Sequence, residues 1–131
     1  MASKLKATII DHLNLDVRDF KETFEFYNKV FGFELLADQP ERNCQIVGNE
    51  HVKLCFYQVF DLELGQGLNH LGFHISNYDE IIEVCKTLGV PVLYEGTEKV
   101  WEKSKSLYIE DPNGYEIELS LIEGGGLWQI L

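Results

Sequence analysis

The chain has 131 residues, 45% of them hydrophobic, which is enough for one domain with an ordinary core and too few for two. Its 22 acidic and 11 basic residues give a formal net charge of -11. So few basic residues leave no positive stripe for phosphates or for an anionic membrane, which excludes binding to nucleic acid or a membrane surface.

The first predicted strand and helix lie in "DHLNLDVRDF", residues 11–20, and in the segment that follows it. Apolar and polar residues alternate up to Val17, which is typical of a strand with one buried face. Asp19, with Glu22 three residues later, is the pattern of a helix N-terminus, and Gly32 is a natural stop. The core face of this helix is predicted from aromatic residues at helical spacing, which are Phe20, Phe24, Tyr27 and Phe31.

Three short strands are predicted after this helix, over about residues 34–37, 43–47 and 52–59. Gly48-Asn49 marks the turn between the last two strands, because both residues favour tight turns. Residues 60–67 follow as a connector. The first half of the chain is therefore predicted as strand, helix and three strands.

The second half begins with "NHLGFHISNY", residues 69–78, which repeats the pattern of the first strand. Asn77 and Glu80 take the two capping positions, so a second helix is predicted, and it ends at Gly89. Its predicted core face is Tyr78, Ile81, Ile82, Cys85 and Leu88.

Three strands are again predicted after the helix, over about residues 92–95, 106–109 and 115–121. "DPNG", residues 111–114, is a strong hairpin turn between the last two of them. The second half therefore repeats the order of the first.

The repeat sets the predicted architecture, because His70 follows His12 by 58 positions and heads an equivalent strand. The fold class is α+β, with two tandem βαβββ modules in a single domain over 1–131. Their predicted bounds are about 8–59 for module 1, 60–67 for the connector, about 68–122 for module 2 and 123–131 for a C-terminal tail.

Successive side chains of a strand point to opposite faces, so parity separates core residues from those that face away. The residues of interest that face away from the core are His12, His70, Glu118, Lys53 and Tyr108. The core set of the same strands is Leu13, Leu15, Val17, Leu71, Phe73, Ile75, Ile117, Leu119 and Leu121.

Two imidazoles and one carboxylate, with other positions open, suit one divalent Fe, Mn, Ni or Zn ion. His12, His70 and Glu118 supply such a set if the two halves associate by their internal symmetry. A strand histidine opposite a core face is more often simply solvated. The equivalent positions of the two histidines in the repeat favour the metal site.

Four motifs in order give the chain a family resemblance: "DHLNLDVRD", "FYNKVFGFELL", "NHLGFHI" and "YIEDPNGYEIELS". They cover residues from about 9 to 121 and resemble the vicinal oxygen chelate superfamily of glyoxalases, bleomycin-resistance proteins and extradiol dioxygenases. The resemblance implies a curled mixed sheet around a metal-binding cavity. It implies the ligands His12, His70 and Glu118, and a homodimer.

One position departs from glyoxalase I, which usually adds a fourth ligand, commonly Glu, on the strand that ends the first module. In "EHVKLCFYQV" the matching residue is Lys53, and a protonated lysine has no lone pair for a metal. A three-ligand site, as in extradiol dioxygenases and fosfomycin-resistance transferases, is favoured instead. Arg18 and Arg42 are the only arginines, so the basic cluster expected around a phosphonate is missing.

The leading hypothesis is a metal-dependent lyase, isomerase, transferase or dioxygenase that chelates neighbouring oxygens of a small-molecule substrate. Tyr108 is predicted to donate a proton or hydrogen bond, and Lys53 to position an anionic group or act as a base. The structural alternatives are a place in the cavity wall for Tyr108 and a pair with Glu116 or another acidic residue for Lys53. The alternative function is a non-catalytic binding protein of the bleomycin-resistance type.

Three cysteines without a CxxC pair predict free thiols and a reducing compartment. With no apolar run long enough for a signal peptide or a membrane span, a cytoplasmic protein is expected. In the tail, "GGGLWQIL" places apolar residues after three glycines. It is expected to cover the cavity or pack on a partner chain, with a disordered end as the alternative.

Overall fold

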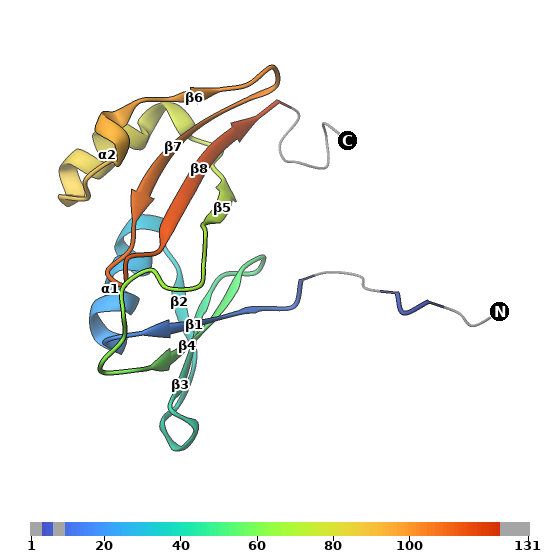
Figure 1. Cartoon of the computed structure of the whole chain (residues 1–131), viewed down its shortest axis with the longest axis vertical. Coiled ribbons are helices and arrows are strands. Elements are labelled where there is room, and N and C mark those ends of the chain that lie inside the picture. The colour runs from blue at the N-terminus through green and yellow to red at the C-terminus, as the bar shows by residue number, and fades with distance from the viewer. Residues whose placement is uncertain (1–3, 7–9, 124–131) are drawn as a thin grey trace. The chain divides into compact units, whose positions relative to one another are not determined.

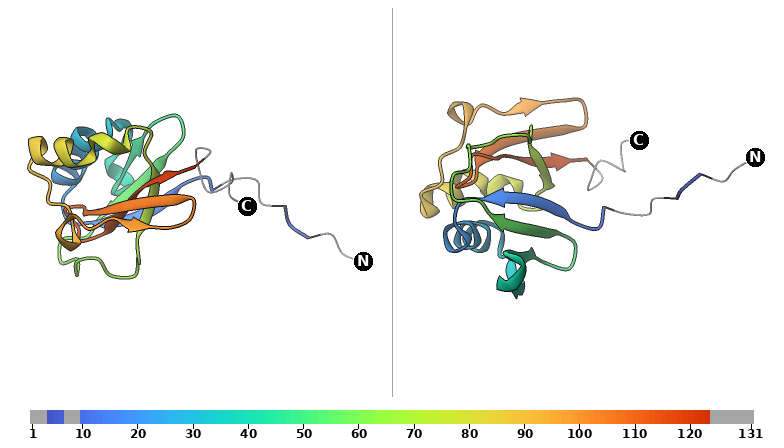
Figure 2. Two further views of the ribbon diagram at one scale, coloured as in Figure 1. Left: turned by 90° about the horizontal axis from the view of Figure 1, so that it is seen from above. Right: turned by 60° about the horizontal axis from the view of Figure 1, so that its bottom comes forward.

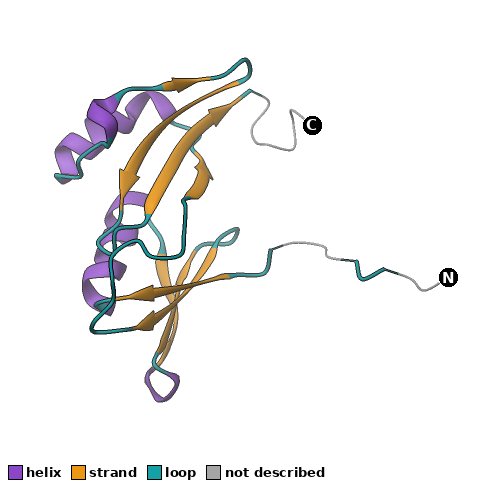
Figure 3. Cartoon of the chain, in the orientation of Figure 1, coloured by secondary structure: helices purple, strands orange, loops and turns teal. Residues whose placement is uncertain are grey.

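The structure is a computed structural model that describes residues 4–6 and 10–123. It contains two four-stranded mixed sheets and two α-helices, an α+β fold (Figures 1 and 3). The chain divides into two compact units, residues 1–61 and 62–131, with the division inside the predicted connector. The predicted fold class is confirmed in its order of elements, since each unit is built as βαβββ.

The first unit comprises β1 (Leu13–Val17), α1 (Phe20–Phe31), β2 (Glu34–Gln39), β3 (Cys44–Gly48) and β4 (Lys53–Gln58), with a short 3₁₀ turn at Pro40–Arg42. The strand order is β1-β4-β3-β2. β1 and β4 run parallel, as the blue and green arrows show in the right view of Figure 2, and the other pairs are antiparallel. A parallel pair needs a long crossover, which α1, β2 and β3 supply.

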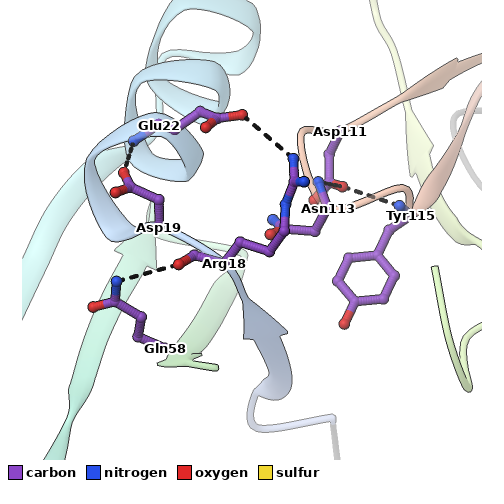
Figure 4. A network of polar contacts seen from close by, with 7 residues as sticks. All are labelled: Arg18, Asp19, Glu22, Gln58, Asp111, Asn113 and Tyr115. Carbon is purple, nitrogen blue, oxygen red and sulfur yellow. Dashed lines mark hydrogen bonds and ion pairs between the residues drawn. The ribbon is translucent and has the colours of Figure 1, made fainter. Parts of the chain in front are cut away.

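Helix α1 begins and ends as predicted. The Asp19 carboxylate accepts a hydrogen bond from the backbone N–H of Glu22 at 2.7 Å (Figure 4). Gly32, with φ of 70°, ends the helix in the left-handed conformation. The most buried face differs from the predicted stripe: Thr23, Phe26 and Tyr27 are buried, while Phe20, Phe24 and Phe31 are half-buried.

The core of the first unit lies between α1 and one face of the sheet, around Tyr27, Val17, Val47, Leu54 and Phe56, all fully buried. Leu13 was predicted to belong to this core and is 38% exposed. It is the first residue of β1, an edge strand that has a neighbour on one side only.

The second unit comprises β5 (Leu71–His74), α2 (Ile81–Leu88), β6 (Lys99–Val100), β7 (Ser104–Glu110) and β8 (Glu116–Ile122). The strand order β5-β8-β7-β6 repeats that of the first unit, and β5 is again parallel to the last strand. The buried residues Leu71, Ile109, Ile117 and Leu119 lie on the predicted core face.

The start of the second helix was predicted wrongly. Tyr78–Glu80 form a 3₁₀ turn, and α2 begins only at Ile81. The Asn77 amide donates to the Glu80 carboxylate at 2.6 Å instead of capping a backbone N–H, so the expected capping box does not form. Ile82, predicted in the core, is 52% exposed because the short helix buries only Ile81 and Cys85.

The strand predicted over 92–95 is also wrong. Only Val92 makes a bridge, to Ile109, and Tyr94–Gly96 form a second 3₁₀ turn. Tyr94 and Glu95 both have positive φ, of 55° and 57°, a conformation that ends a strand. The first strand after the helix lies later, at β6, where it pairs with β7.

The β7–β8 hairpin forms at the predicted "DPNG" turn. The buried Asp111 carboxylate accepts hydrogen bonds from the backbone N–H groups of Asn113 and Tyr115, at 2.8 and 3.0 Å (Figure 4). Gly114 has φ of 82°, and a Cβ there would lie 2.9 Å from the Gly65 nitrogen and from the Leu64 Cβ, so only glycine fits.

Cys44, Cys55 and Cys85 are free, as predicted, and all three are buried. No helix of the described residues is long and apolar enough to cross a membrane. Of the predicted tail, 123–131, only Glu123 belongs to the described residues.

Candidate functional site

Two of the three predicted metal ligands lie together in the second unit. His70 directly precedes β5, and Glu118 lies on the neighbouring strand β8, opposite Gly72. The His70 Nε2 atom is 3.3 Å from Glu118 Oε1, and both side chains are partly exposed. The pairing follows from the sheet, because β5 and β8 are adjacent parallel strands and Gly72 places no side chain between the two groups.

The ring of His70 is held from its other side. Its Nδ1 atom lies 2.7 Å from the Asn69 Oδ1 atom. An amide oxygen only accepts, so in the neutral ring the tautomer with its proton on Nδ1 fits this contact and leaves a lone pair on Nε2. Nε2 then faces a carboxylate oxygen at 3.3 Å, and two such acceptors repel each other unless a shared proton or cation lies between them. The donor set of His70 and Glu118 therefore fits a divalent metal ion.

His12 has the same local arrangement in the first unit. It directly precedes β1, and its Nδ1 atom lies 2.7 Å from the Asp11 carboxylate. The carboxylate accepts from Nδ1–H, and in the neutral ring Nε2 then carries the lone pair. Metal-binding histidines commonly donate their second N–H to a carboxylate or carbonyl in this way. Both repeats thus present a histidine that is oriented by the preceding Asp or Asn.

The sequence reasoning missed Asp11 and Asn69, although "DH" and "NH" open the two repeats. A hydrogen bond between a side chain and the imidazole ring of the next residue produces no periodic pattern in the sequence. Only the matching places of Asp11 and Asn69 in the two repeats could have indicated their role. Within residues 4–6 and 10–123, no group of three or more His, Cys, Asp or Glu side chains gathers to hold a metal ion. The three-ligand set with His12 therefore stays a prediction.

Tyr108 lies beside the His70–Glu118 pair. It occupies β7 directly opposite Glu118 on β8, and its ring meets the His70 ring edge to face at 6.0 Å. Burial, followed by the negative charge of Glu118 and a hydrogen bond to it, raises the pKa of the Tyr108 hydroxyl above its ordinary value. Tyr108 thus keeps its proton at neutral pH and is a hydrogen-bond donor at this site.

Tyr94 and Lys99 lie beside Tyr108 in the second unit, and the sequence analysis did not predict either of them as a site residue. The Tyr94 ring meets the Tyr108 ring edge to face at 5.7 Å, and its hydroxyl donates a hydrogen bond to Glu116. The Lys99 ammonium lies 4.9 Å from the centre of the Tyr108 ring, within the range of a cation–π contact. Two phenols and one ammonium therefore line this face of the second unit.

A predicted strand over residues 92–95 does not give the observed direction of the Tyr94 side chain, because Tyr94 lies in a 3₁₀ turn. Its backbone has φ of 55°, which most side chains avoid. Such strain persists where surrounding contacts hold it, and it is common at binding sites. The hydrogen bond to Glu116 is one such contact.

Lys53, the predicted catalytic lysine, is exposed at the start of β4 in the first unit, opposite Gly48 on β3. Among residues 4–6 and 10–123 it forms no ion pair with an acidic side chain. The alternative, a pair with Glu116 or another acidic residue, stays a prediction; within the second unit the Glu116 carboxylate accepts a hydrogen bond from Tyr94.

A family model described as the Glyoxalase/Bleomycin resistance protein/Dioxygenase superfamily matches residues 9–119. Among curated proteins, a lactoylglutathione lyase of Escherichia coli O157:H7 is 29% identical over 119 residues, covering 82% of this chain and 88% of its own. Virulence protein STM3117 of Salmonella typhimurium is 28% identical over 118 residues, covering 85% of this chain and 82% of its own.

Solved structures share the fold. The fosfomycin resistance protein FosX of Listeria monocytogenes superimposes with a TM-score of 0.75 at 23% identity, over 95% of this chain and 97% of its own. A mutant of FosX has been crystallised with Mn(II) and 1S,2S-dihydroxypropylphosphonic acid. The crystal structure of STM3117 gives a TM-score of 0.72 at 24% identity, over 90% of this chain and 99% of its own.

Proposed function

Because the chain belongs to the glyoxalase/bleomycin resistance protein/dioxygenase superfamily, we propose that it is a divalent-metal-dependent enzyme acting on a small molecule with two neighbouring oxygens. The observation that carries the proposal is the His70 Nε2 atom facing the Glu118 carboxylate at 3.3 Å, while its Nδ1 atom lies 2.7 Å from Asn69 Oδ1. His12 would complete the ligand set, and the ion would be Fe, Mn, Ni or Zn. When bound, it would supply Lewis-acid stabilisation of negative charge on the chelated oxygens.

The side chains of this unit have roles that follow from their contacts. Asn69 fixes the His70 ring so that Nε2 stays available. Tyr108, whose raised pKa keeps it protonated, donates a hydrogen bond to a substrate oxygen beside Glu118. Lys53, the second predicted catalytic residue, belongs to the first unit, and its role of positioning an anionic part of the substrate is carried over from the sequence prediction.

The chemistry of lactoylglutathione lyase is not part of the proposal, although the curated relatives include such enzymes. Lys53 stands where glyoxalase I usually has a fourth, carboxylate ligand, and its ammonium cannot bind a metal. A three-ligand site of the lyase, transferase or extradiol-dioxygenase type fits this residue better. We also propose a homodimer, and a cytoplasmic location remains the expectation from sequence.

The test is turnover of catechols, α-keto hemithioacetals and epoxides by the metal-loaded protein. Turnover that disappears in Glu118→Gln, and falls in Tyr108→Phe while metal binding is kept, is the expected result. A control with His51→Ala, an exposed histidine in the β3–β4 turn, should retain full activity. Loss of turnover in the control as well would contradict the assignment of these roles.

The second candidate is a non-catalytic binding protein of the bleomycin-resistance type. The perpendicular rings of Tyr94 and Tyr108, with Lys99 over the latter, favour it because such a wall can hold a flat, anionic ligand. Tight binding of a panel compound without turnover, and with affinity unchanged in Glu118→Gln, would support this candidate over the enzyme.

A further inference from the structure

A groove separate from the candidate metal site lies in the second unit. It has a volume of about 570 Å³ and is formed where β5 ends, at the β6–β7 hairpin and at the end of β8. Neither His70, Glu118, Tyr108 nor Tyr94 borders it. The residues used below are Val100 and Trp101 of the hairpin, Lys103 after it, and Leu121, Ile122 and Glu123 of β8 and its end.

The groove leaves large apolar side chains uncovered. Trp101 is 67% exposed and Val100 is 70% exposed, and both lie in the hairpin that borders the groove. Leu121 and Ile122 add apolar surface from β8 and are only partly buried. Adjacent exposed apolar side chains of this size indicate a surface that another segment covers.

The sequence supplies a segment of matching character at the border of this groove. The Glu123 N–H donates a hydrogen bond to the Lys103 carbonyl at 2.8 Å, so the chain leaves β8 beside the hairpin. Residues 124–131 follow as "GGGLWQIL", with no charged side chain. Gly124–Gly126 span at most about 10 Å, which tethers Leu127 close to the groove.

We propose that residues 127–131 of the same chain dock in this groove through Leu127, Trp128, Ile130 and Leu131 and cover Trp101. The tether is the reason to choose the same chain, because a short covalent link gives a local concentration in the millimolar range. A second copy of the protein would have to reach that concentration in solution to compete.

Docking would also affect the wall that carries Lys99. Strand β6 has only two residues, Lys99 and Val100, and it holds to β7 through the pairs Lys99–Ser106 and Val100–Lys105. A segment packed on Val100 and Trp101 would stabilise this short strand and keep Lys99 over the Tyr108 ring. This consequence rests on the proposed function, whereas docking itself does not.

The chain contains only two tryptophans, Trp101 and Trp128, which makes docking directly measurable. In Trp128→Phe, and in a chain cut after Glu123, Trp101 is the only tryptophan that emits. We expect the cut chain to show emission at longer wavelength and several-fold stronger quenching by acrylamide than Trp128→Phe. Adding the peptide GGGLWQIL to the cut chain should reverse the rise in quenching.

A second variant tests docking without truncation, in case the cut chain misfolds. It is the full-length Trp128→Phe protein that also carries Leu127→Asp and Ile130→Asp, and its Trp101 should be quenched as strongly as in the cut chain. Its control is Trp128→Phe with Gln129→Asn, which should not change the quenching. Equal quenching with and without the segment, in proteins of the same circular dichroism, would overturn the proposal. Protection that vanishes on dilution would overturn the same-chain assignment and indicate a second copy. Metal content serves as a separate readout, so failure of docking and failure of the proposed function are distinguishable.

Discussion

Replacing Asn69 with alanine tests whether His70 is a metal ligand held in place by its neighbour. The change removes the 2.7 Å contact to His70 Nδ1 and nothing else in the hydrogen-bonding of the ring. Because this hydrogen bond is exposed, its loss should lower the free energy of unfolding of the metal-free protein by only about 0.5 kcal/mol. Loss of support for a metal-bound histidine typically weakens metal affinity about 10- to 100-fold. That factor corresponds to about 1.4 to 2.8 kcal/mol of binding free energy.

Two measurements separate these effects: calorimetric titration of the metal-free protein with Mn(II) or Zn(II), and thermal unfolding without metal. Asn69→Asp restores an acceptor and copies the Asp11–His12 pair of the first repeat, so it should recover the affinity. Asn77→Ala is the matched control, since it removes another exposed side-chain hydrogen bond of the same unit. If Asn69→Ala binds metal as tightly as the parent while His70→Ala binds none, the reasoning on ring orientation is refuted.

Four further predictions concern the Tyr108 phenol and the fold. Tyr108→Phe should reduce turnover at least about 100-fold without changing metal content. Because burial and the neighbouring Glu118 raise the pKa of Tyr108, the 295 nm absorbance that the metal-free parent shows and Tyr108→Phe lacks should appear only above the ordinary tyrosine range; its appearance at the ordinary value would contradict this. Asp111→Ala leaves two backbone N–H groups in the β7–β8 turn without their acceptor. The free energy of unfolding, measured in urea, should fall by about 2 to 4 kcal/mol. A fall of less than about 1 kcal/mol would contradict the stabilising role of the Asp111 carboxylate. Asp19→Ala should cost about 1 kcal/mol through loss of the α1 cap, and equal losses in Asp19→Ala and Asn77→Ala would show that the two helix starts do not differ as described.

The order of elements could be predicted because it depends on local signals that the repeat states twice. Alternation marks β1 and β5, glycines end both helices, and "DPNG" fixes the last hairpin. Parallel pairing of the first and last strand in each unit follows from the crossover through the helix.

The predicted helix start at Asn77 and the predicted strand over residues 92–95 were wrong for the same reason. At both places several local conformations have similar energies. Asn77 can bond either to a backbone N–H or to the Glu80 carboxylate, and it takes the carboxylate. Residues 92–95 have strand-like composition, yet Tyr94 and Glu95 adopt positive φ, and Tyr94 bonds to Glu116 across 22 positions. No window of sequence contains that partner.

The candidate site was predictable to the extent that parity places side chains on a face. Parity and the repeat selected His70, Glu118 and Tyr108, which the structure brings together in the second unit. Parity carries no information on which neighbouring side chain orients a ring, so Asn69 and Asp11 were found only from the contacts. Whether His12 joins the set depends on an association that strand patterns do not describe.

Metal content of the purified protein tests the central claim most directly. Protein prepared without added metal should contain about one equivalent of a divalent transition metal per chain by elemental analysis. His12→Ala, His70→Ala and Glu118→Gln should each lose most of it, while His51→Ala should keep it. Metal-free parent protein that also takes up no Fe, Mn, Ni or Zn, or full metal content in all three ligand variants, would contradict the account.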